Sequence, residues 1–233
     1  RLSDNQSSGE LSRSDTIITP QAQAIYSNTF SRQNVSLDAA IYSPRYLQNE
    51  SMDYTGHSFS GNWLGSVAER WHPQLSYENS QTLASFDDVA LGLKDMINEQ
   101  TFSGGLAYGG ERYAKVLVDG SRKEKDHSSQ VWLNLVDQGF GMSGGWISDA
   151  GSQATLRYDH RDIHFVNPLA YYLSRDYTQQ KWQIRTVWPV THQTRLSADI
   201  GRIAWDFDAN SSHSSDYIGG SSAVWAPTEK LRL

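Results

Sequence analysis

Three short patterns in the sequence could carry chemistry, and two of them overlap. The stretch GFGMSG at 139–144 matches the G-x-G-x-x-G of dinucleotide-binding loops, and GMSGG at 141–145 matches the G-x-S-x-G around a catalytic serine. Both sites need a helix after the loop, because one places pyrophosphate at the helix N-terminus and the other lifts Ser143 from a strand–turn–helix elbow. The following residues, WISDAG at 146–151, predict a strand end and a turn instead. We therefore expect neither a nucleotide cofactor nor a catalytic serine.

The third pattern is a pair of histidines, His160 and His164. On a helix this spacing brings two ligands to one metal ion, but on a strand the two side chains lie about 13 Å apart. The chain contains no cysteine, which excludes thiolate metal sites and disulfides. We expect no metal, no cofactor and no enzymatic activity. A hydrolase would need an acid, a base and a nucleophile clustered near one rim, and no convincing set is visible in the sequence.

Composition argues against several classes of protein. Aromatic residues make up 12% of the 233 residues, with eight Trp, which argues against disorder. The net charge of −6 argues against a nucleic-acid partner, because phosphate binding favours a basic face. The longest apolar run, at 169–173, has about five residues, so no transmembrane helix is expected. The polar start at 1–14 lacks the apolar core of a signal peptide.

Alternation of apolar and polar residues predicts long strands. Trp182, Ile184 and Trp188 alternate with Gln183 and Arg185, for example, which places the two kinds of side chain on opposite faces. Turn signals recur roughly every 40 residues, each flanked by about 10–15 alternating residues. The predicted turns are 31–33, 69–73, 109–111, 149–152, 189–192 and 227–229, and the longer polar stretches between them are 46–54, 87–98, 120–129, 167–175 and 209–215.

Two long strands per unit favour one β architecture over the others. A propeller would pack four short strands into about 40–50 residues, and a soluble sandwich usually has shorter strands. Strands of about 10–15 residues can cross a bilayer, and bacterial barrels alternate short periplasmic turns with longer outside loops. We predict an all-β fold: an antiparallel transmembrane up-and-down β-barrel, with residues 1–233 forming a single segment of about eleven strands and the start of a twelfth. A soluble secreted β-protein is the alternative.

Three details complete the predicted fold. Bacterial barrels have an even number of strands and both termini in the periplasm, so we expect strands beyond both ends of this segment and a total of about fourteen or more. Residues 88–100 have helical periodicity and predict a short helix in an outside loop, which caps the loop or constricts the lumen. Near Gly201–Arg202 the apolar set moves from even to odd positions (Ile203, Trp205, Phe207), which predicts a β-bulge.

The alternation also predicts which residues meet water and which meet lipid. Residues at the polar positions of three strands are expected to line an aqueous lumen: Arg157, Asp159, Arg161, Lys181, Gln183, Arg185, Arg195 and Asp199. In a narrow barrel such charges form salt bridges that fill the interior, and in a wide one they line the pore; about fourteen strands favour the pore. Aromatic residues near the strand ends predict a girdle at the lipid headgroups: Trp71, Tyr113, Trp146, Trp188, Trp205 and Trp225.

Several phrases of the sequence are similar to one family. The stretches RLSDNQ (1–6), SDTIITPQAQAIYS (14–27), the hairpin at 59–88 and YIGGSSAVWAPTEKLRL (217–233) resemble the EpsL-like outer-membrane β-barrel proteins, porins associated with exopolysaccharide biosynthesis and the PEP-CTERM/exosortase systems of Gram-negative bacteria. The resemblance implies a bacterial outer-membrane location and a channel that serves polysaccharide export, with lipid, polysaccharide and periplasmic secretion components as partners. It implies no catalytic residue. The alternative function is a plugged barrel with a structural or assembly role.

Overall fold

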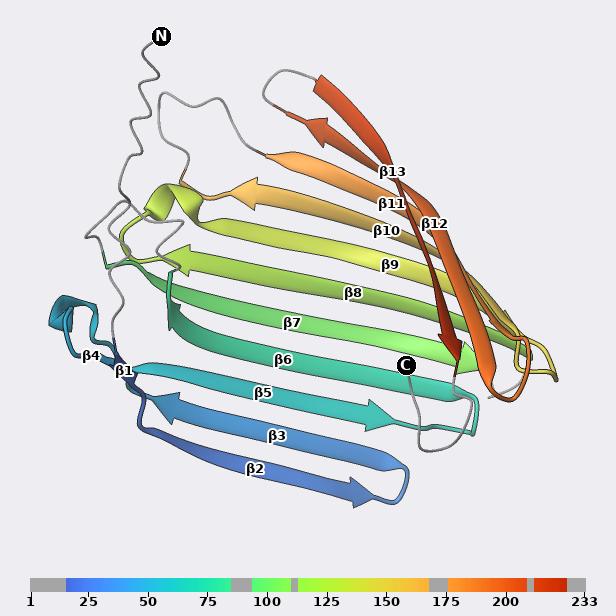
Figure 1. The fold of residues 1–233 in the computed structure, drawn as a ribbon, viewed down its shortest axis with the longest axis horizontal. Coiled ribbons are helices and arrows are strands. Elements are labelled where there is room, and N and C mark those ends of the chain that lie inside the picture. The colour runs from blue at the N-terminus through green and yellow to red at the C-terminus, as the bar shows by residue number, and fades with distance from the viewer. Residues whose placement is uncertain (1–15, 85–93, 110–112, 168–175, 209–211, 226–233) are drawn as a thin grey trace, which may run out of the picture.

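A single antiparallel sheet makes up most of the computed structural model, which describes residues 16–84, 94–109, 113–167, 176–208 and 212–225. Eleven strands of 10 to 15 residues follow one another in sequence order, each hydrogen-bonded to the strands before and after it (Figure 1). They are β2 (Gln21–Phe30), β3 (Gln33–Tyr42), β5 (Gly56–Gly65), β6 (Trp71–Leu83), β7 (Met96–Gly109), β8 (Tyr113–His127), β9 (Leu135–Ile147), β10 (Gln153–Phe165), β11 (Tyr177–Pro189), β12 (Thr194–Phe207) and β13 (Ser212–Trp225). The prediction of an all-β, antiparallel, up-and-down fold is confirmed.

The two ends of the strands differ in how the chain connects them. At one end, which we call the turn-proximal end, short connections join the hairpins at 31–32, 66–70, 148–152 and 190–193. Backbone hydrogen bonds close them, as from Ser148 N–H to the carbonyl oxygen of Ser152 (2.8 Å). The predicted turns at 109–111 and 227–229 lie wholly or mostly outside the described residues.

Longer connections join the strands at the other end, the loop-proximal end. They carry the pair of two-residue strands β1 (Ile17–Ile18) and β4 (Arg45–Tyr46) and two single 3₁₀ turns, η1 (Glu50–Met52) and η2 (Val131–Leu133). In the described part of the chain, no helix has the length and apolar character needed to span a membrane.

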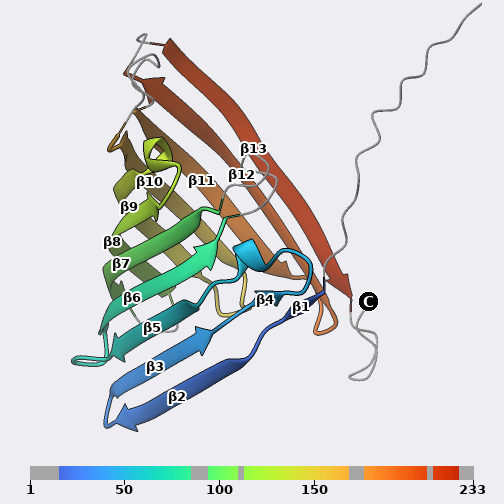
Figure 2. The same cartoon turned by 90° about the vertical axis from the view of Figure 1, so that its left-hand side faces the viewer.

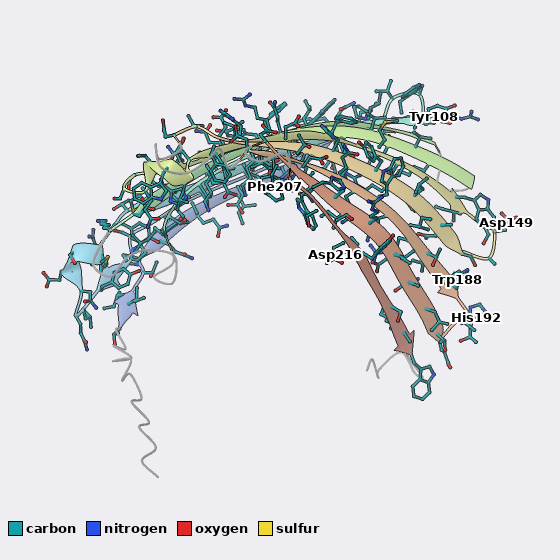
Figure 3. All side chains as sticks on the ribbon, turned by 90° about the horizontal axis from the view of Figure 1, so that it is seen from above. Tyr108, Asp149, Trp188, His192, Phe207 and Asp216 are labelled. Carbon is teal, nitrogen blue, oxygen red and sulfur yellow. The ribbon has the colours of Figure 1, made fainter. Side chains whose placement is uncertain are left out.

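The sheet is curved and open. Seen from above it forms an arch, with Tyr108 on the convex face and Phe207 and Asp216 on the concave face (Figure 3). A view turned by 90° shows the sheet curling from β2 to β13 (Figure 2). Among the described residues β2 and β13 are the two edge strands and do not pair with each other. The buried apolar residues of the described part are only Tyr46, Met52, Ala84, Ala107 and Ile163, and of these only Ala107 and Ile163 lie in the eleven-stranded sheet, so it has almost no core.

Three local predictions are wrong. Pairing between β11 and β12 runs without interruption from Pro189–Arg195 to Tyr177–Phe207, so there is no bulge at Gly201–Arg202. Most of the polar stretch 120–129, predicted as a loop, belongs to β8, which ends at His127. Of the predicted helix 88–100, residues Met96–Gln100 begin β7, residues up to 93 lie outside the description, and Lys94 and Asp95 precede the strand.

Candidate functional site

The eight predicted lumen residues lie on one face of the sheet, the concave one. In the register Arg157 is opposite Gln183, Asp159 is opposite Lys181, and Arg185 is opposite Asp199. Arg161 and Arg195 fall on the same face, because partners in a ladder share a face and residues two apart along a strand do too. The predicted facing of these residues therefore agrees with the register, and their place in a closed lumen stays a prediction.

One arginine on the concave face joins two strands across a third. The guanidinium of Arg157 on β10 donates from Nη1 and Nη2 to both oxygens of Asp119 on β8, each at 3.0 Å, and from Nε to Asp159 at 2.8 Å. We call Arg157, Asp119 and Asp159 the arginine cluster. To reach Asp119 the arginine crosses β9 above Gly141, where a Cβ atom would lie 2.4 Å from its Nη2 atom. The absence of a side chain at Gly141 is therefore what permits the bridge.

Further polar pairs continue this network on the same face. Arg161 pairs with Asp137 on β9, and the Lys123 ammonium lies 2.7 Å from Glu99 on β7. Gln183 donates to Asp199 at 3.2 Å. These contacts link neighbouring strands, and pairs of this exposure contribute little individually to stability.

Other cations on the concave face make no ion pair with the residues that the structure describes. Among the described residues, Lys181, Arg185 and Arg195 make no ion pair, although Arg185 faces Asp199 in the register. The eight predicted residues thus divide into three paired residues on β10, the hydrogen-bonded Gln183 and Asp199, and three cations on β11 and β12 that make no ion pair among the described residues. An unpaired cation facing solvent is free to interact with a solute.

A depression of about 520 Å³ lies beside the arginine cluster. Gly139 and Gly141, which leave the concave face of β9 without side chains there, are part of its lining. The polar lining comes from three strands, β8, β10 and β11, and includes Ser121, Gln179 and Lys181 in addition to the cluster. Ile203 and Ile218 close one side, so the depression offers hydrogen-bonding groups beside an apolar wall.

The turn-proximal half of the convex face is apolar and exposed. The residues of this apolar band are each 39% to 62% exposed, although they are large and hydrophobic. They are Leu75, Phe102, Leu106, Val116, Val118, Phe140, Met142, Leu156, Trp182, Ile184, Leu196 and Ile200. Contiguous apolar surface of this extent is rare on soluble monomers and marks a membrane or protein contact.

Tryptophans border the apolar band at the turn-proximal end. Trp71, Trp146, Trp188 and Trp225 share the convex face and are 44% to 53% exposed. The ring of Trp71 packs on Tyr108 of β7 with 4.7 Å between centroids. Tyr113 begins β8, and its side chain lies outside the described residues. The four tryptophans form a row where a headgroup girdle is expected.

In the loop-proximal half the convex face carries polar residues and the concave face carries aromatic ones. On the convex face a row of polar partners runs from β8 to β13: Arg122, Gln138, Asp162, Thr178, Asp206 and His213. On the concave face Tyr177 pairs with Phe207, with 5.5 Å between ring centroids, and Trp205 lies opposite Gln179. Trp205, predicted as part of the girdle, therefore lies on the opposite face of the sheet from Trp188, because β12 keeps its register and its odd positions remain concave.

A buried Asp–His pair organises one connection at the loop-proximal end. The Asp95 carboxylate is almost fully buried and lies 2.6 Å from Nδ1 of His127, and it accepts hydrogen bonds from the backbone N–H groups of Ser129 (2.7 Å) and Gln130 (3.4 Å). Burial acts to raise the pKa of Asp95, but the hydrogen bonds and the His127 charge outweigh it and lower the pKa. This pair was not predicted from the sequence, because the two residues are 32 positions apart and no local pattern joins them.

The short motifs lie within strands and lack the geometry that each would need. Residues 139–145 lie inside β9, which continues to Ile147, so Ser143 stands in a strand and not at an elbow. His160 and His164 contact different carboxylates, Asp162 (3.3 Å) and Asp176 (2.5 Å). The described residues contain no group of three or more histidine or carboxylate side chains placed to hold a metal ion.

Comparison of the sequence with protein-family models gives no match, and neither does comparison with curated proteins. The resemblance to the EpsL-like family therefore stays a prediction.

Proposed function

We propose that this chain forms the wall of an outer-membrane β-barrel that conducts an exopolysaccharide or its fragments through a polar lumen. The single observation that carries the proposal is the opposite chemistry of the two faces in the turn-proximal half. The convex face has the exposed apolar band, while the concave face at the same level has the arginine cluster and the unpaired cations. Lipid outside and water inside would account for both faces.

The tryptophan row and the polar convex row support a position for the membrane. Trp188 lies six residues from Trp182 along β11, which is about 20 Å of strand, and Gln180 beyond it is polar. Because barrel strands tilt by about 35–45°, this length corresponds to about 14–16 Å along the membrane normal, within the roughly 25 Å apolar band of outer-membrane barrels. The loop-proximal parts of the strands would then stand outside the membrane, in water on both faces.

Closure of the sheet is part of the proposal. Edge strands with free N–H and C=O groups cannot face lipid, because nothing there satisfies them. In the membrane β2 and β13 must each gain a neighbour, and further strands of the same barrel would provide one.

Conduction would need no covalent chemistry. A hydroxyl-rich chain would exchange water for hydrogen bonds with the concave wall, each weak enough to break as the chain moves. Side chains that already pair with one another, such as Arg157 and Asp119, would hold the wall in shape, and the unpaired cations would contact the solute.

The proposal is tested by single-channel recording. The full protein, folded in detergent and reconstituted in a planar bilayer, should show steady conductance that the producer's polysaccharide interrupts. Absence of conductance from a barrel proven folded by heat-modifiable gel migration would contradict the channel and leave the second candidate, a structural barrel. The arginine cluster favours that candidate, because it ties β10 to β8 across β9 and stiffens the wall.

A further inference from the structure

The depression on the concave face contains one cation whose charge is available. Arg157 is occupied by Asp119 and Asp159, and Arg161 by Asp137. Lys181 also lines the depression and makes no ion pair among the described residues. Its nearest carboxylate in the register, Asp159, already accepts two contacts from Arg157. The next acid, Asp216, lies two strands away, beyond Ile203.

Aromatic rings lie beside this lysine on the same face. Lys181 pairs with Ile203 in the ladder, and the next concave pair along the strands is Gln179 with Trp205. The diagonal from Lys181 to Trp205 is about 7–8 Å, within reach of long side chains. Tyr177 and Phe207 follow, so the concave surface changes from charged to aromatic within two ladder positions.

The combination fits one class of ligand. The face of an aromatic ring is electron-rich and packs against weakly positive C–H groups, which pyranose rings present on their flat sides. Sugar hydroxyls would find partners in Ser121 and Gln179, and a negative group on the sugar would find Lys181. About 520 Å³ is within the usual size range of small-molecule sites.

We propose that the depression and the adjoining aromatic rings bind one or two units of an acidic polysaccharide, with a uronate carboxylate at Lys181 and a sugar ring on Trp205. This inference rests on the proposed channel in that it names the class of polymer the wall accepts. Neutral polymers would keep the contact with Trp205 and lose the one with Lys181.

Calorimetric titration of the full, folded protein in detergent tests the site without requiring conduction. The probes are a galacturonate trimer and, as its neutral counterpart, a glucose trimer. We expect the acidic trimer to bind at least about tenfold more tightly, and Lys181→Gln to remove that advantage. Trp205→Leu should weaken both trimers, by about fivefold. Asp216→Asn should strengthen the acidic trimer by about twofold, because it removes a negative charge about 10 Å away.

The matched control is Arg202→Gln. It removes the same charge from the position next to Ile203, but from the convex face, where Arg202 contacts Ser215 at 3.4 Å. It should leave both affinities unchanged. Equal binding of the two trimers, or equal effects of Lys181→Gln and Arg202→Gln, would overturn the site.

Conductance recorded on the same preparations separates the two proposals. Binding without conductance would remove the channel and keep the site. Conductance without preferential binding of the acidic trimer would keep the channel and remove the site.

Discussion

The turn-proximal and loop-proximal halves of the same strands carry their apolar residues on opposite faces of the sheet. In the first half Ile184 and Ile200 are convex and opposite one another, whereas a few residues further along Gln180 lies between Ala204 and His160 on that face. On the concave face the change is reversed, from Gln183 and Asp199 to Tyr177 and Phe207. The register does not change between the halves. The surroundings of the convex face must therefore change along the strand.

A boundary between lipid and water would produce this change. Where lipid contacts the convex face, polar side chains are confined to the concave face. Beyond the boundary the convex face is solvated, and apolar residues gain by moving to the concave face, which the curvature partly shelters. On this interpretation the exchange of faces locates the outer membrane surface along each strand.

The largest expected effect is a lysine placed on the convex face below this boundary. Ile184→Lys puts a charge where we propose the acyl chains lie, at a cost of about 2–4 kcal/mol, and should prevent stable insertion into liposomes. Ala204→Lys puts the same charge on the same face above the boundary and should insert normally. Gln183→Lys, on the concave face, should also insert. The measure is the fraction of protein that is protease-resistant and heat-modifiable after folding into vesicles.

If Ile184→Lys and Ala204→Lys fold equally well, the two halves do not differ in surroundings and the proposed membrane position is wrong.

The second prediction compares alanine substitutions on the two faces of β9 in the turn-proximal half, by their effect on the free energy of unfolding. Gly141→Ala brings a methyl group within 2.4 Å of Nη2 of Arg157 and should displace the guanidinium from its carboxylates. We expect unfolding in urea to become easier by about 1–2 kcal/mol. Gly144→Ala, on the convex face of the same strand, has nothing within 4 Å of the new Cβ and should change stability by less than about 0.5 kcal/mol. Equal costs would mean that the arginine cluster adds nothing specific to the wall.

Much of the fold could be predicted from hydropathy alone. Where one face of a strand is apolar, apolar residues recur at every second position, as at Trp182, Ile184 and Trp188. This alternation predicts both the strand and which side chains share a face. The four tryptophans of the convex row were found in the same way, because rings of this kind gather near the short turns.

The rest depended on surroundings that one sequence does not encode locally. In β8 both Arg122 and Lys123 meet water, so the alternation vanishes and the strand was predicted as a loop. The apolar residues of β12 do move from even to odd positions at Ile203. They move because the concave face becomes the apolar one there, while the strand itself continues without a bulge. Which charges pair was also hidden, since Arg157 reaches Asp119 across an intervening strand, 38 residues away in sequence.

The loop-proximal half should respond to acid through Asp95. The pKa of this carboxyl is lowered in the folded protein, so ionised Asp95 stabilises the fold at pH values above the unfolded pKa of about 3.9. That stabilisation is lost as the pH falls from this value through the lower folded pKa. We expect the melting temperature of the protein to exceed that of Asp95→Asn at pH 7, and the difference to shrink below about pH 4. A difference that is the same at pH 7 and pH 3 would show that the charge of Asp95 is irrelevant.

The smallest effect should come from the ion pair of Lys123 with Glu99, on the concave face of the loop-proximal half. Both side chains are 35% exposed, and on the proposed membrane position water on both faces of the sheet would screen their attraction. Lys123→Gln should therefore change the free energy of unfolding by less than about 0.5 kcal/mol, and 1 M salt should not change it further. A loss as large as that of Gly141→Ala would place this pair in a dry environment. The proposed boundary would then have to move toward the loops, beyond Lys123.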